Sequence, residues 1–118
     1  MKICRRDVVN VVFGSNTREN HLVIVLSPEE INSEERQFLG MMITDSPYFD
    51  RNNDYSFPLD DSMFVHPLKE KGSKARLFLI NFLKVETIVS GKRVNEMRIE
   101  PFRELIKELN LKVFGVEL

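Results

Sequence analysis

The sequence has a single cysteine, no tryptophan and no long hydrophobic run. Cys4 has no partner for an internal disulfide bond, and one thiol cannot form a cysteine-rich zinc centre. A chain with so little cysteine fits a reducing, intracellular compartment. Its longest apolar runs, Val8–Phe13 and Leu77–Leu83, are much shorter than the roughly 20 residues that span a bilayer. We therefore expect a cytoplasmic chain with no membrane segment.

The sequence also lacks an excess of either charge, because 17 Lys and Arg residues oppose 18 Asp and Glu residues. A strongly cationic field, the usual mark of a nonspecific nucleic-acid binder, is therefore excluded. Any polyanion would have to bind at a local basic patch. The hydrophobic content of 42% and the charged content of 30% are typical of a folded globular protein. The length of 118 residues predicts one domain spanning 1–118, built around one hydrophobic core.

Motifs for several common chemistries are absent as well. The sequence contains no glycine-rich phosphate loop, no nucleophile elbow and no histidine pair at helical spacing. His21 and His66 are its two histidines, so a three-histidine metal centre is impossible within one chain. We expect a site that uses no metal ion and no cofactor.

Most of the chain is patterned as short β-strands, in which β-branched and apolar residues are bounded by glycine, proline or polar clusters. A short helical turn is expected at Pro28–Glu30, with Ser27 as its N-cap. The predicted strands are Val8–Phe13, His21–Leu26, Phe38–Thr44, Tyr55–Leu59, Met63–His66, Arg76–Phe82, Lys84–Val89, Val94–Ile99 and Leu111–Val116.

The hydrophobic period changes near the C-terminus. Phe102, Leu105, Ile106 and Leu109 follow the spacing i, i+3, i+4, i+7, which predicts an amphipathic helix over Glu100–Leu109. Many short strands followed by one late helix indicate a mainly β fold, either a small barrel or a curled sheet.

Candidate functional residues lie near the ends of the second and third predicted strands. Arg18 precedes the second strand and His21 begins it, while Thr44 and Ser46 end the third. Because adjacent strand ends can converge in a small barrel, an imidazole, a guanidinium and hydroxyls can meet there. Hydroxyls and Arg bind phosphate oxygens, and imidazole, whose ordinary pKa is about 6.5, exchanges protons near neutral pH. The set predicts a phosphodiester site; the alternative is that His21 and Thr44 only support their strands.

A basic segment lies further along the chain, in the loop Pro67–Lys74 and the start of the next strand. Its cations are Lys69, Lys71, Lys74 and Arg76. Because binding of RNA needs positive charge, this segment is a candidate contact for phosphates. The alternative is an ordinary solvated loop.

Four segments occur in an order that is shared with a known family. Arg6–Gly14 is a charged start and a hydrophobic strand that ends in Phe-Gly, and His21–Pro28 is a second strand that ends in Leu-Ser-Pro. Ile43–Ser46 closes the third strand with Ile-Thr-Asp-Ser, Arg76–Leu83 is a later strand, and an amphipathic helix follows. In this order the chain resembles, over most of its length, the PemK/MazF family of type II toxin–antitoxin endoribonucleases.

The resemblance implies an SH3-like small barrel with a C-terminal amphipathic helix, usually assembled as a homodimer. It also implies a toxin that cleaves single-stranded RNA without a metal ion and that binds a cognate antitoxin protein. In the family, an Arg at the start of the second strand and a Ser or Thr at the end of the third form the active site. Aligning Leu26–Pro28 with the family places His21 at the Arg position and Thr44 at the Ser/Thr position.

Two specific functions remain open at this stage, beside the generic possibility of a small structural β-domain of a larger assembly. In the first, the protein is an endoribonuclease in which His21 takes the proton of the ribose 2′-hydroxyl while Thr44 and Arg18 hold the phosphate. In the alternative, the replacement of Arg by His21 leaves a catalytically degenerate SH3-like module that binds RNA or a protein without cutting.

Overall fold

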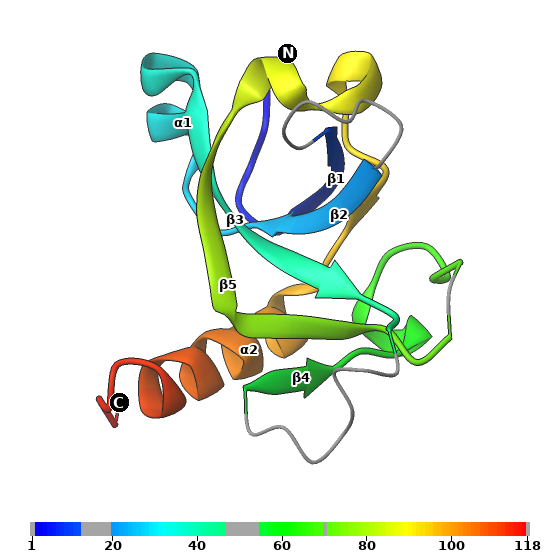
Figure 1. The fold of residues 1–118 in the computed structure, drawn as a ribbon, viewed down its shortest axis with the longest axis vertical. Helices are drawn as coiled ribbons and strands as arrows, with labels where there is room; N and C mark the ends of the chain where they lie inside the picture. The colour runs from blue at the N-terminus through cyan, green and yellow to red at the C-terminus, as the bar shows by residue number, and fades with distance from the viewer. Residues whose placement is uncertain (1, 13–19, 47–54, 70, 118) are drawn as a thin grey trace.

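The computed structural model describes residues 2–12, 20–46, 55–69 and 71–117, which form a bent antiparallel sheet with helices beside it (Figure 1). The strands are β1 (Asp7–Val12), β2 (Asn20–Val25), β3 (Gln37–Thr44), β4 (Ser56–Pro58), β5 (Lys74–Lys84) and β6 (Asn95–Glu96). The helices are α1 (Glu29–Glu35) and α2 (Ile99–Lys112), and 3₁₀ turns lie at Asp61–Met63, Val85–Thr87 and Val89–Gly91.

The six strands of the described residues form one sheet in the order β4-β5-β3-β2-β1-β6, with all neighbours antiparallel. The sheet curls into a half-barrel, and α2 follows it at the C-terminal end of the chain (Figure 1). The expected mainly β fold with a C-terminal amphipathic helix is therefore confirmed.

Both faces of the sheet carry buried apolar side chains. Successive residues of a strand point to opposite faces. Because both faces are buried here, the sequences of β1 and β2 are nearly continuous apolar runs and do not alternate with polar residues. The first core lies on the face covered by α2 and includes Val8, Ile24, Met41, Ile43, Ala75, Leu77, Met97, Phe102, Leu105 and Leu109. The second core lies on the opposite face and consists of Ile3, Val9, Val11, Val23, Val25, Phe38, Leu83 and Ile88.

β5 is the longest strand, and it bends. Gln37–Met41 of β3 pair with Ile80–Lys84, whereas Ile43 and Thr44 pair with Ala75 and Lys74. One residue of β3 therefore faces a longer stretch of β5, and this irregularity turns the strand sharply in Figure 1. The bend places the start of β5, Lys74–Arg76, alongside β4.

Several predicted strands are wrong in their extent. The expected strand Lys84–Val89 is wrong beyond Lys84, which ends β5 by pairing with Gln37, the first residue of β3. The chain then forms 3₁₀ turns and meets β1 in a single bridge, between Ile88 and Val11. The expected strand Leu111–Val116 is wrong because α2 continues to Lys112, where an ion pair with Glu108 at 3.2 Å closes the last turn.

Two shorter predictions hold only in part. Met63–His66 contributes a single bridge, between Phe64 and Met97, after the 3₁₀ turn. Of Val94–Ile99, the two residues of β6 pair as a strand, and Ile99 already belongs to α2.

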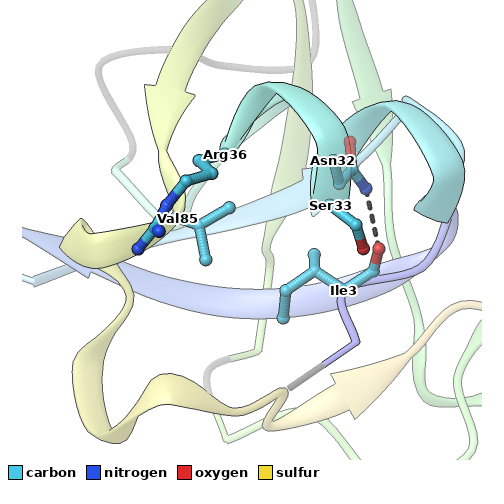
Figure 2. Close-up of a pocket in the computed structure, with 5 residues that line it drawn as sticks. All are labelled: Ile3, Asn32, Ser33, Arg36 and Val85. Carbon is cyan, nitrogen blue, oxygen red and sulfur yellow. Dashed lines mark hydrogen bonds between the residues drawn. The ribbon is translucent and has the colours of Figure 1, made fainter.

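The predicted helical turn after Pro28 is confirmed and is longer than expected, but Ser27 does not cap it. No side chain caps α1, whose N-cap position is Pro28. The Ser27 hydroxyl instead donates to Asn32 Oδ1 at 2.6 Å and accepts from the Leu39 backbone N–H at 2.8 Å. The buried Asn32 amide donates to the Ile3 carbonyl at 2.7 Å, which ties α1 to the N-terminal segment (Figure 2).

Candidate functional site

His21 and Thr44 lie at the same end of two neighbouring strands. β2 and β3 pair Val23 with Met42 and Ile24 with Met41. The paired register ends at Val23 and Met42, and His21 and Thr44 each stand two residues beyond it. Both side chains are half-buried. The two residues that the sequence predicts as catalytic therefore belong to one strand end, as convergence of the strands requires.

Thr44 is also in contact with two further predicted residues. On its other side, Thr44 pairs with Lys74 of β5. The Thr44 hydroxyl accepts a hydrogen bond from the Ser46 backbone N–H at 3.1 Å. Lys74 Nζ donates to the Ser46 carbonyl oxygen at 3.2 Å. Thr44, Ser46 and Lys74 thus form one hydrogen-bonded group.

This group lies at the margin of the second core. Residues two apart on a strand share a face, and Val23 and Met42, which stand two residues from His21 and Thr44, pack in that core. Lys74 shares the same face because it lies directly across from Thr44. On this face of the sheet, buried apolar side chains give way to the half-buried polar residues Thr44 and Lys74. A polar ligand can reach these partly desolvated groups from solvent.

The other predicted cations are not part of this group. Arg76 is buried and donates through Nη1 to the Ser56 hydroxyl of β4 at 2.6 Å. Lys71 is exposed and forms an ion pair with Asp61 at 2.7 Å. Lys69 is exposed, and Arg18 lies outside the described residues. The basic segment is therefore divided, with Lys74 alone among Lys71, Lys74 and Arg76 hydrogen-bonded to the Thr44–Ser46 turn.

The Asp61–Lys71 pair has a clear electrostatic effect. The pKa of Asp61 is lowered chiefly by the hydrogen bond from Lys71, and also by the bond that Asp61 Oδ1 accepts from the Leu68 backbone N–H at 2.9 Å. The ionised Asp61 carboxylate thereby pairs with the charge of Lys71. It binds the basic loop at two points, the Lys71 side chain and the Leu68 backbone.

His66 lies in a different part of the molecule. Its backbone N–H donates to Asn95 Oδ1 at 3.1 Å and its carbonyl accepts from Asn95 Nδ2 at 3.0 Å, which places it beside β6. β6 stands at the edge of the sheet beyond β1, so the His66 loop is separated from the Thr44 strand by two further strands.

Sequence reasoning missed the contact between Ser56 and Arg76. The two residues meet because β4 and β5 pair Ser56 with Arg76. No local pattern specifies that long-range pairing, so the only available signal was the candidate strand around Ser56.

No group of three or more His, Cys, Asp or Glu side chains in the described parts of the chain is arranged to hold a metal ion. Of the helices in those parts, none is long and apolar enough to cross a membrane.

Comparisons with known proteins give matches for the structure alone. Neither the protein-family models nor the curated proteins contain a match to the sequence. Among solved structures, a MazE–MazF complex from Deinococcus radiodurans is similar, with a TM-score of 0.73, 13% identity, and coverage of 99% of this chain and 99% of that chain.

Two mycobacterial structures are also similar. An endoribonuclease in complex with its cognate antitoxin from a mycobacterial species matches with a TM-score of 0.69 and 11% identity, over 99% of this chain and 97% of that one. The Mycobacterium tuberculosis toxin MazF-mt6 matches with a TM-score of 0.67 and 13% identity, over 96% of this chain and 100% of that one.

These likenesses extend over nearly the full length of each chain, whereas the identities are too low to carry an activity from one protein to another. The resemblance read from the order of segments is thus confirmed for the architecture: the chain has the fold of the MazF/PemK toxins.

Proposed function

We propose that the protein is the toxin of a type II toxin–antitoxin pair and cleaves single-stranded RNA without a metal ion, in the cytoplasm. The observation that supports the proposal is that His21 lies near the start of β2 and Thr44 ends β3, which are neighbouring antiparallel strands, so an imidazole and a hydroxyl lie towards the same end of the two strands. The MazF-like fold supports it, because compared structures with this fold are described as endoribonucleases.

In the proposed reaction, His21 removes the proton of the ribose 2′-hydroxyl, and the resulting oxyanion attacks the adjacent phosphorus. The bond from phosphorus to the 5′-oxygen breaks, that oxygen takes a proton from water, and His21 then returns the proton it removed to solvent. The Thr44 hydroxyl donates to a non-bridging oxygen, on which negative charge accumulates in the transition state. The products are a 2′,3′-cyclic phosphate and a 5′-hydroxyl end.

A homodimer and an antitoxin partner are part of the same proposal. β5 exposes Phe78, Leu79 and Phe82, with exposed fractions of 65%, 40% and 77%. Tyr55 packs edge-on against Phe78, with ring centroids 5.7 Å apart. Exposed apolar patches of this kind mark protein–protein contacts. Compared structures include a complex with a cognate antitoxin and a MazE–MazF complex.

The test of the activity is cleavage of a long single-stranded RNA by the purified protein in EDTA. We expect His21→Ala and Thr44→Ala each to reduce kcat/KM by about 100-fold or more, since general base catalysis and one oxyanion donor are each worth at least that factor. Thr44→Ser, which keeps the hydroxyl, should retain most of the activity. The matched control is His66→Ala, which removes the other histidine and should cleave like the wild type.

The alternative of a catalytically degenerate binding module is favoured by one specific observation, the presence of His21 where the resemblance expects Arg. An imidazole lacks the bidentate, permanently charged contact that a guanidinium makes with phosphate. RNA that binds and stays intact in the assay above would support the module and contradict the enzyme.

A further inference from the structure

Lys74 has a setting that differs from that of an ordinary surface lysine. It begins β5, is half-buried, and lies across from Thr44. Its ammonium donates to the carbonyl oxygen of Ser46 at 3.2 Å, so the long side chain lies against the turn that follows Thr44. The ammonium is thus held at the turn that follows Thr44 by a contact with a neutral group.

The charge of Lys74 is not cancelled within the described part of the chain. None of the ion pairs formed there includes Lys74. An ammonium carries three N–H donors, and the Ser46 carbonyl takes one of them. The remaining donors are available to an incoming oxygen.

Two neighbouring cations do not offer the same combination of charge and position. Lys71 is neutralised by Asp61 and is highly exposed. Arg76 is bound to Ser56 on the β4 side of the strand. Lys74 therefore lies close to Thr44 and has no carboxylate partner among the described residues. Neither Lys71 nor Arg76 has both of these properties.

The proposed chemistry needs such a charge for a further reason. A histidine that acts as the base must be neutral when it accepts the proton, so at that moment it cannot also neutralise the phosphate. The amine of a lysine stays protonated at neutral pH. A lysine beside the hydroxyl separates the two tasks: one group transfers the proton and the other holds the charge.

We infer that Lys74 is the fixed positive charge of the site and that its ammonium binds a non-bridging oxygen of the scissile phosphate beside Thr44. This is the role that the sequence alone gives to Arg18. The inference rests on the proposed function, which names RNA as the substrate.

The test compares Lys74→Gln with Lys112→Gln, which removes a lysine that is paired with Glu108 on α2, in the full-length protein. The amide of Gln can still donate to the Ser46 carbonyl but carries no charge, so the variant removes the ammonium with little change in structure. Two readouts are measured: cleavage of single-stranded RNA, and binding of a fully 2′-O-methylated RNA oligonucleotide, which lacks the nucleophile, over a series of salt concentrations.

We expect Lys74→Gln to lower kcat/KM by about 100-fold or more, the effect of removing one donor to the developing charge. The slope of log K against log salt should decrease in magnitude by about 0.7, the value for one phosphate contact on a single strand. Lys74→Arg, which keeps the charge, should restore most of the activity and the slope. Lys112→Gln should cleave within about 3-fold of the wild type, because its charge is already paired with Glu108 on α2.

The two readouts separate failure of this inference from failure of the proposed function. If the wild type cleaves RNA and Lys74→Gln matches it in rate and in salt slope, the inference is overturned while the function stands. If the wild type does not cleave, the function fails, and the salt slope alone decides Lys74: a reduced slope supports it as a phosphate ligand, and an unchanged slope overturns it. A thermal melt of each variant checks that it folds, and Lys74→Met replaces Lys74→Gln if the amide variant does not.

Discussion

At the scale of single residues, buried Asp7 shows how the first strand is anchored. Its carboxylate accepts from the Cys4 backbone N–H at 2.8 Å and from Arg93 Nη1 at 3.1 Å, while Arg93 also donates to Glu96 at 2.7 Å. The pKa of Arg93 is raised, chiefly by its hydrogen bond to Asp7. The start of β1 is thereby joined to β6 through one guanidinium.

The first prediction removes this guanidinium. Arg93→Met should lower the free energy of unfolding by about 1–3 kcal/mol, because the buried Asp7 carboxylate loses its charged partner. Urea denaturation measures the change. The matched control is Arg103→Met, whose partner Glu100 is as exposed as Arg103 itself and whose loss should cost at most about 0.5 kcal/mol. Equal effects of the two substitutions would contradict the anchoring role.

A second prediction concerns Asp61 and pH. Because the pKa of Asp61 lies below its ordinary value of 3.8, its bonds to Lys71 and Leu68 stabilise the fold above that pH. The stabilisation is lost as the pH falls through the lowered value. Asp61→Asn should therefore be less stable than the wild type at pH 6, and the difference should shrink as the pH falls below 3.8. Thermal melts across the acid range measure it; a difference that grows towards low pH would refute the assignment.

At the scale of elements, α1 depends on one buried side chain of its own, Asn32, more than on intrinsic helix stability. It has only seven residues and no side-chain cap, so its intrinsic stability is low. Asn32 supplies the missing contacts by donating to the Ile3 and Ser27 carbonyls at 2.7 and 3.0 Å. Beside it lies an open cavity of about 280 Å³, lined by Ile3, Asn32, Ser33, Arg36 and Val85 (Figure 2).

The third prediction follows from these bonds. Asn32→Leu should destabilise the protein by about 2–4 kcal/mol, since the buried Ile3 carbonyl and the half-buried Ser27 carbonyl lose their donor and Leu cannot replace it. Ser33→Ala is the control, because its hydroxyl bonds to the Glu29 side chain on the exposed side of α1. Chemical denaturation of both variants measures the costs. If Asn32→Leu proves as mild as Ser33→Ala, the buried amide does not hold the element.

The elements that local patterns specify are the ones the sequence predicts well. The apolar runs of β1, β2 and β3 and the helical spacing around Leu105 each identify an element without reference to distant residues. The strand expected at Lys84–Val89 fails because strand pairing, and not propensity, decides where β5 ends. The strand expected after Asn110 fails because the helix keeps its partners for another turn.

At the scale of the whole molecule, near-neutral charge coexists with a local site. The 17 cationic and 18 anionic residues nearly cancel, and several cations are paired with carboxylates across the described surface. An anion would therefore be attracted to positions where a cation lacks a carboxylate, as Lys74 does in the described part of the chain. The sequence identifies Lys74 as a candidate cation but does not predict its position, because the pairing of Lys74 with Thr44 depends on the irregular β3–β5 register.

The candidate site thus divides into a part that the sequence predicts and a part that requires the fold. Thr44 and His21 are identified from their strand ends and the resemblance, and they lie at the same end of two neighbouring strands. What distinguishes Lys74 from the two neighbouring cations is visible only in the fold. Lys71 is paired with Asp61 and Arg76 is hydrogen-bonded to Ser56, and both partners belong to other segments of the chain.

The measurement that tests the central claim most directly is end-group analysis of a single-stranded RNA incubated with the purified protein in EDTA. The proposed mechanism predicts 5′-hydroxyl and 2′,3′-cyclic phosphate ends, no cleavage where the attacking 2′-hydroxyl is replaced by hydrogen, and loss of both products in His21→Ala. Intact RNA, or fragments that carry 5′-phosphate ends, would contradict it.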